Sequence, residues 1–323
     1  GVAMSLDLII RNARLARAPA GAPLQDIGIE GGRIVDIKPT IAGEAPTLDA
    51  GGRLVSPGLI ETHIHLDKSR ILDRASPSPN RGRDHMERVA AVKPSFTVED
   101  VYRRARATLE AGILFGTSHV RTHVEVDPNV GLRSFEALQQ LAKDYAWAVD
   151  LELCAFIQEG QTNSPEADAN LVAALERGAK LVGGAPGYDP DRPGQIRRIF
   201  ELAKAYDVDV DIHLDVGPSA EDMDIWLVCD LADKIGWGGR VTVGHGVKYS
   251  CLAGDGLAEL GRRMAGAGVA LTVLPATDLF VSGRHQDHSV MRGVADANAL
   301  MACGVNCSLS TNNVLNPFTP FGD

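Results

Sequence analysis

Several features are scarce in this sequence, and each absence narrows the classes of protein to consider. No run of Lys or Arg is long enough to follow a phosphate backbone, and the formal net charge is −10, so we expect no nucleic-acid partner. No apolar stretch approaches the roughly 20 residues of a membrane helix, and the first residues lack the layout of a signal peptide. The five cysteines include no Cys-x-x-Cys pair, so we expect reduced, mostly buried thiols in a cytoplasmic protein.

The remaining composition is that of a soluble globular protein. The chain has 323 residues, of which 45% are hydrophobic and 23% are charged, and this suffices to bury a large core. The length fits one large barrel domain or two ordinary domains. Assembly into a homo-oligomer stays open at this level.

The first part of the chain has the pattern of a small β subdomain. Short strand patterns joined by turns occur at residues 6–10, 26–30, 33–37 and 54–56. Gly31 and Gly32, between two of these strands, predict a tight hairpin. We therefore interpret residues 1–56 as the first half of a small β subdomain and residues 57–323 as a separate, larger domain.

From residue 57 onward, strand patterns alternate with amphipathic helical patterns. The predicted strands are residues 58–65, 117–126, 148–157, 181–185, 208–216, 241–245, 270–274 and 305–310. The predicted helices are residues 98–111, 134–143, 166–177, 195–206 and 257–267. Such alternation predicts a parallel sheet, and eight units of it close into a barrel. The expected fold class is therefore α/β, a (β/α)8 TIM-type barrel.

Two segments depart from a complete, compact barrel. The connection over residues 71–95 is long, polar and rich in Pro and Arg, which is typical of a lid over a binding site; a disordered insertion is the alternative. The eighth strand is expected to end near Asn312 and the chain stops at Asp323. We therefore expect the C-terminal part of the barrel, including its eighth helix, to be missing.

The sharpest chemical signal lies at the end of the first barrel strand, in the run from Glu61 to Lys68. Strand side chains alternate between faces, so His63 and His65 point the same way, into the mouth of the barrel. Two imidazoles at this spacing can share one cation. Two packed or exposed histidines are the alternative.

Two further histidines fall at strand ends. His213 lies near the end of the fifth predicted strand and His245 at the end of the sixth. One histidine on a strand is more often structural than a ligand. Four of them at the C-terminal ends of three strands indicate a metal site, because active sites of this fold lie on that face.

The other histidines and one lysine carry weaker signals. Contact with the site is one interpretation of His123 on the second strand, but a satisfied core position or a position that supports the ligands is favoured. The polar surroundings of His85, His285 and His288 predict surface positions. Lys180 lies at the N-terminal end of the fourth strand, so no lysine is placed to bridge two metal ions, and we expect one ion rather than two.

Five segments together resemble the cytosine deaminase-like branch of the amidohydrolase superfamily, which includes an s-triazine aminohydrolase that acts on N-isopropylammelide. These segments are residues 7–13, 55–68, 121–127, 155–160 and 314–318, so the resemblance runs almost the whole length of the chain. Lys68 within His-Leu-Asp-Lys is similar to the triazine enzyme rather than to cytosine deaminase.

The resemblance implies one divalent metal ion, zinc or iron, held by His63, His65 and His213, with a fourth ligand from the end of the eighth strand. It also implies that Gln158 hydrogen-bonds the substrate ring, that Lys68 orients or protonates near the leaving group, and that His245 assists catalysis. The metal would activate water for attack on an electron-poor ring carbon.

The sequence departs from the family pattern where the fourth ligand is expected. The family has an Asp at the position of Asn312, and an amide coordinates weakly and cannot act as a base near neutral pH. Three explanations stay open: an engineered replacement, a natural member whose base lies elsewhere, and a protein that only binds. Val216 stands where cytosine deaminase has a Glu, which argues against cytosine deamination in particular.

The function predicted from these residues is metal-dependent hydrolysis of a carbon–nitrogen bond on a small N-heterocycle, such as a triazine or a pyrimidine. In this prediction Asn312 is both a metal ligand and a catalytic residue. The main alternative is a catalytically impaired member, or pseudoenzyme, that only binds its ligand. A binuclear cyclic-amide hydrolase is a third hypothesis, which two metal ions per chain would favour.

Overall fold

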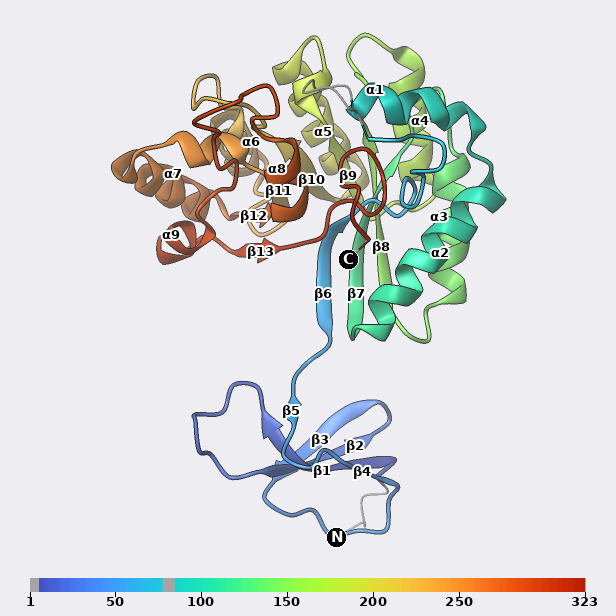
Figure 1. Cartoon of the computed structure of the whole chain (residues 1–323), viewed down its shortest axis with the longest axis vertical. Coiled ribbons are helices and arrows are strands. Elements are labelled where there is room, and N and C mark those ends of the chain that lie inside the picture. Colours follow the sequence, from blue (N-terminus) through green and yellow to red (C-terminus); the bar gives the residue numbers. More distant parts are fainter. Residues whose placement is uncertain (1–5, 78–84, 323) are drawn as a thin grey trace. The chain divides into compact units, whose positions relative to one another are not determined.

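The structure is a computed structural model that describes residues 6–77 and 85–322 (Figure 1). The chain forms two compact units, Gly1–Gly58 and Leu59–Asp323. Within the described residues, no helix combines the length and the apolar character needed to cross a membrane.

The first unit is a small β-sheet. Its strands are β1 (Leu8–Leu15), β2 (Gln25–Glu30), β3 (Arg33–Lys38), β4 (Thr47–Asp49) and β5 (Leu54–Val55). Their order is β3-β2-β1-β4, with β5 paired to β1. Gly31 and Gly32 join β2 to β3 with φ values of 58° and 73°. A two-residue hairpin loop with positive φ at both positions favours glycine, so the hairpin prediction is confirmed. The three-residue strand β4 was too short for its pattern to predict.

The second unit is a nearly closed barrel of parallel strands. These are β6 (Leu59–Ile64), β7 (Thr117–Glu125), β8 (Asp150–Ile157), β9 (Leu181–Gly184), β10 (Asp209–Leu214), β11 (Val241–His245), β12 (Val269–Val273) and β13 (Cys307–Leu309). They pair in chain order from β6 to β13. The backbone then closes the ring, because Asn312 N donates to His63 O and His65 N donates to Asn312 O, each at 2.8 Å. The predicted TIM-type barrel is confirmed.

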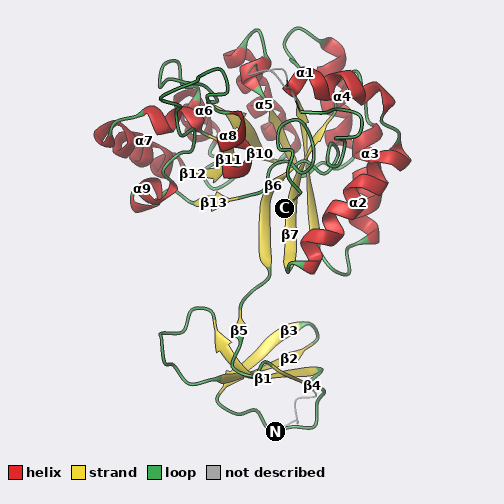
Figure 2. Ribbon diagram, in the orientation of Figure 1, coloured by secondary structure: helices red, strands yellow, loops and turns green. Residues whose placement is uncertain are grey.

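Helices surround these strands, as Figures 1 and 2 show. They are α1 (His85–Val92), α2 (Val98–Leu114), α3 (Arg133–Asp144), α4 (Pro165–Glu176), α5 (Arg192–Tyr206), α6 (Ile225–Ile235), α7 (Gly254–Ala267), α8 (Pro275–Val281) and α9 (Ala297–Ala302), with the 3-10 turns η1 (Lys93–Ser95), η2 (Pro186–Tyr188) and η3 (Val247–Cys251). Every predicted helix is present. The helices α1, α6, α8 and α9 were not predicted from the sequence.

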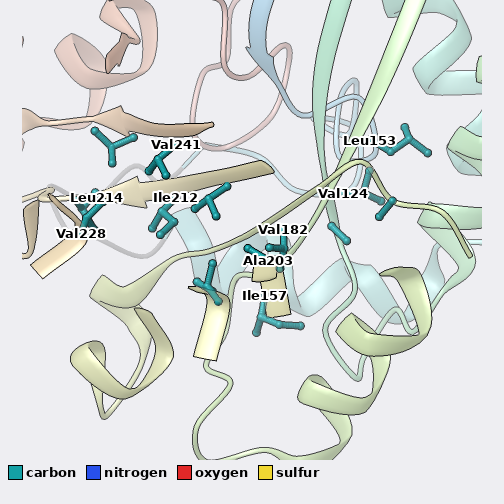
Figure 3. Packing of buried hydrophobic residues seen from close by; sticks show 14 of the residues in the cluster. Val124, Leu153, Ile157, Val182, Ala203, Ile212, Leu214, Val228 and Val241 are labelled. Atoms are coloured by element: carbon teal, nitrogen blue, oxygen red, sulfur yellow. The ribbon is translucent and has the colours of Figure 1, made fainter. Parts of the chain in front are cut away.

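The main hydrophobic core lies between the strands and their helices, and Figure 3 shows part of it. In β10, Val210, Ile212 and Leu214 belong to this core. The alternate residues Asp211 and His213 therefore point into the barrel. The same alternation applies in β7, so that the barrel interior is polar and the helix-facing layer is apolar.

The segment over residues 71–95 differs from the predicted loop. Residues 85–95 are helical, in α1 and η1, and their buried side chains include Val89 and Lys93. Arg81 and Arg83, which suggested a polar lid, lie outside the described residues. The cysteines also differ in part from the expectation: all five are free, Cys154 and Cys229 are buried, and Cys251 is exposed.

Candidate metal centre and its cavity

Histidines from three barrel strands converge at the C-terminal ends of those strands. His63 ends β6 with His65 just beyond it, His123 lies in β7 and His213 in β10. Each of the four offers a ring nitrogen, and these atoms all lie within 4.8 Å of one another. The Nε2 atoms of His65 and His213 are only 3.0 Å apart. The three predicted histidine ligands are therefore brought together.

The imidazoles of His63, His65 and His213 are held in the neutral form. Burial, with the neighbouring histidines and Lys68, holds the pKa values of His63, His65 and His213 well below the ordinary value of 6.5. A neutral imidazole carries the lone pair that a metal ligand needs. Both ring nitrogens of His63 are buried without a hydrogen-bond partner among the described residues. Unpartnered buried nitrogens are costly unless a bound group uses them.

His123 is closer to this centre than the sequence indicated. Its ring centroid lies 4.0 Å from that of His63. Neither of its ring nitrogens has a hydrogen-bond partner in the described part of the chain, although Nε2 lies 3.4 Å from Asp211 Oδ1. The unpartnered nitrogens do not fit a satisfied core position, whereas the other two alternatives, contact with the site and support of the neighbouring ligands, agree with this place beside the cluster.

Asn312 lies at the point where the barrel closes, with its side chain directed to the same region. Its backbone has φ 66°, a left-handed conformation that Asn and Asp tolerate better than most residues. The side chain is buried, and Oδ1 has no hydrogen-bond partner in residues 6–77 and 85–322. The amide oxygen is thus available to a group bound beside the histidines.

The conformation of His245 explains how it faces the cavity. Val241 and Val243 pack in the core, so strict alternation along β11 would direct His245 toward the helices as well. Its φ of 76° breaks the strand at this residue, and the side chain lines the cavity instead. Gly244 leaves room for the neighbouring ring, because a Cβ there would come within 3.0 Å of His63 Cε1.

His245 has a buried carboxylate partner that the sequence did not reveal. Its Nδ1 lies 2.6 Å from Oδ1 of Asp278, which comes from α8 after the seventh barrel strand. Asp278 is fully buried, and its Oδ2 has no partner among the described residues. A carboxylate at Nδ1 fixes the ring orientation and directs Nε2 away from itself.

A cavity of about 350 Å³ opens beside the histidines and is lined by His65, Lys68, Gln158, His213, His245 and Asn312, among others. Lys68 Nζ donates to Glu125 at 2.6 Å and lies 4.3 Å from the centroid of the Phe318 ring. The Gln158 backbone N–H donates to Asp127. Every residue predicted for the site therefore lies at this cavity or at the histidine cluster. Its volume suits a small ligand.

Some residues at or near the cavity differ from what the sequence predicted. His85, predicted at the surface, begins α1 and lines the cavity. Val216, which the resemblance aligned with a Glu of cytosine deaminase, lines it as well. Asp215 accepts hydrogen bonds from Asp224 N and from the Tyr249 hydroxyl. Asp215 therefore stabilises the start of α6 through these hydrogen bonds. Glu221, another acid in this segment, is exposed.

Comparisons with known proteins agree with this geometry. The amidohydrolase family model matches residues 54–318. The chain is 29% identical to N-isopropylammelide isopropyl amidohydrolase of Pseudomonas sp. (strain ADP), over 98% of this chain and 77% of that protein. It is 26% identical to pterin deaminase of Rhizobium rhizogenes, over 92% of this chain and 69% of that protein.

Solved structures give the same result. One is 5-methylcytosine deaminase from Klebsiella pneumoniae liganded with 5-fluorocytosine, with a TM-score of 0.89 and 30% identity over 97% of this chain and 77% of that one. Another is N-isopropylammelide isopropylaminohydrolase from Burkholderia multivorans, with a TM-score of 0.82 and 28% identity over 98% of this chain and 77% of that one. With the barrel and the histidines at its mouth, these matches show that the chain belongs to the amidohydrolase family.

Proposed function

We propose that this protein is a metal-dependent hydrolase that cleaves a carbon–nitrogen bond of a small, electroneutral N-heterocycle, such as a triazine or a pyrimidine. The observation that carries the proposal is the cluster of imidazoles beside the cavity, with His65 Nε2 and His213 Nε2 3.0 Å apart. The family match supports hydrolytic chemistry on such bonds.

The donor set fits one divalent cation. His63, His65 and His213 would hold it, and Asn312 would add a weak oxygen ligand through Oδ1. Imidazole nitrogens suit zinc and iron, whereas calcium and magnesium prefer oxygen donors. When bound, such a cation supplies the Lewis acidity that makes water a nucleophile near neutral pH.

The protein's own residues would bind the ring and move the protons. Gln158 and Lys68 line the cavity and would hydrogen-bond the ring. The Asn312 amide cannot accept a proton near neutral pH. His245, oriented by Asp278, would therefore take the proton from the attacking water and return it to the departing amine.

The charges around the cavity favour a neutral substrate. Lys68 is paired with Glu125, and Arg192 with Asp224 at 2.9 Å. Lys248 donates to two backbone carbonyl groups. Because the charges of these cationic side chains are already balanced or solvated by the protein, an anionic ring would gain little from them.

A protein that only binds its ligand is not supported by the comparisons. The similar proteins named above are amidohydrolases, aminohydrolases and deaminases. Asn312 alone does not favour loss of catalysis, because the pair formed by His245 and Asp278 offers a second place for the proton.

The test is to express the protein in metal-supplemented medium, measure its zinc and iron content, and assay amine or ammonia release on a triazine, pyrimidine and pterin panel. We expect about one ion per chain and turnover that a chelator abolishes. His63→Ala should lose both metal and turnover, whereas the exposed control His285→Ala should keep both. Metal-free wild-type protein, or metal-independent turnover, would overturn the proposal.

A further inference from the structure

A buried ionic cluster lies behind the cavity and has no role in the reaction proposed above. Its centre is Lys93 in η1, whose side chain is 1% exposed. The Lys93 ammonium pairs with Glu125 and Glu159, and lies 3.4 Å from Asp127 Oδ2. The oxygens that these three carboxylates offer all lie within 4.8 Å of one another, a spacing that could hold a metal ion. The Lys93 ammonium already occupies that position.

Two of the three carboxylates also hold residues that line the cavity. Glu125 Oε1 accepts from Lys68 Nζ at 2.6 Å. Asp127 accepts from the Gln158 backbone N–H at 3.1 Å and from the Glu159 backbone N–H at 2.8 Å. The network therefore connects Lys93 to the Lys68 side chain and to the backbone of Gln158, the two residues that would contact a ring in the cavity.

We propose that Lys93 is a positioning residue. Its ammonium is a tethered internal cation that takes the place of a metal ion among the three carboxylates. In this way it fixes Lys68 and Gln158 at the cavity. Three carboxylates this close repel one another strongly in a buried setting unless a cation lies between them. Lys68 is the other ammonium bonded to Glu125.

Loss of Lys93 would change the site in a defined way. With one ammonium fewer, the carboxylates would draw Lys68 away from the cavity, and Asp127 would hold the Gln158 segment less rigidly. Both side chains bind the ring before and during the reaction, so their loss raises KM more than it lowers kcat. This part of the inference rests on the proposed function.

The test uses Lys93→Ala in the full chain, with the exposed Lys180→Ala as control. Calcium alone is the probe, because it prefers carboxylate oxygens and does not compete for imidazole nitrogens. We expect Lys93→Ala to bind about one Ca²⁺ per chain by calorimetry, whereas the wild-type protein and the control bind none at this cluster. If folded Lys93→Ala gains no Ca²⁺ site, the tethered-cation proposal is overturned.

The second readout is kinetic. With a heterocycle that the wild-type protein hydrolyses, Lys93→Ala should raise KM about tenfold or more, and added Ca²⁺ should restore part of the loss. A role confined to folding would not be rescued by a cation. An unchanged KM would overturn the positioning role. If Lys93→Ala does not fold, Lys93→Gln keeps the side-chain length without the charge, and the same two outcomes apply to it. The calcium measurement needs no turnover, so it decides on Lys93 even if the proposed function fails.

Discussion

Replacing Asp278 by Asn would test how this site moves protons. Asp278 Oδ1 lies 2.6 Å from His245 Nδ1, and the carboxylate is fully buried. Asn has nearly the same shape, so the change removes the charge while leaving the packing of α8 in place. In the proposed mechanism, the carboxylate would stabilise the imidazolium that forms when His245 accepts a proton.

The expected loss follows from the strength of that hydrogen bond. Hydrogen bonds to charged groups contribute roughly 1.5–3 kcal/mol, and each 1.36 kcal/mol corresponds to a tenfold change in rate. The charge alone therefore accounts for a fall in kcat of about 10- to 150-fold for Asp278→Asn. If the new amide donates to Nδ1, the ring adopts the opposite tautomer, and the loss can reach about 10⁴-fold.

The assay is steady-state release of amine or ammonia, with metal content measured on the same samples. Asp287→Asn is the matched control, because Asp287 lies 2.5 Å from His288 Nδ1 in an exposed pair of the same kind. The control should keep the wild-type rate. If Asp278→Asn retains kcat within about twofold of the wild-type value at unchanged metal content, His245 does not depend on this carboxylate and the proposed proton path is wrong.

Three further predictions follow from the same site. Asn312→Asp should tighten metal binding and raise kcat by about 10²-fold or more, the scale of one positioned acid–base group; an unchanged rate with metal bound would contradict a role for this position. Chelation should lower the melting temperature, because an ion at 100 times its Kd contributes about 2.7 kcal/mol; equal melting curves with and without the ion would count against the metal site. In the metal-free protein, His63 has a pKa below the ordinary 6.5 in the folded state, so the stability it contributes is present above pH 6.5 and is lost as the pH falls below that value. Burial raises the pKa of Glu125, but Lys68 and Lys93 outweigh burial and lower this pKa to about 2. The stability that Glu125 contributes is therefore lost only as the pH falls from about 4.5 toward 2. Urea titrations at a series of pH values should show the histidine range and the glutamate range separately. A single acid transition near pH 4 would refute the earlier histidine step.

Much of the fold could be predicted because its signals are local. The period-two pattern of β10 and the helical pattern of α2 each lie within one short window, and eight strand patterns alternating with helical patterns leave few topologies. The elements that were missed have weaker local patterns. The α1 segment is short and lies in a stretch rich in Pro and Arg, and α8 spans only Pro275–Val281.

The site was predictable to the extent that strand geometry dictates it. The His-x-His spacing of His63 and His65 places both rings on one face whatever the rest of the chain does. The convergence of His213 with them followed from its position at the end of a strand, since strand ends of a parallel barrel share one face.

The sequence by itself thus determined the barrel, the side of it that carries the chemistry and the identity of the three histidines. Only the tertiary structure decided that Asp278 supports His245, that His123 joins the cluster and that Lys93 fills the carboxylate site. These pairings join residues 33 or more positions apart, and one of them depends on the left-handed backbone at His245. Alternation along a strand cannot anticipate a residue that leaves the strand conformation, and no local pattern records which distant side chain will neutralise a buried charge.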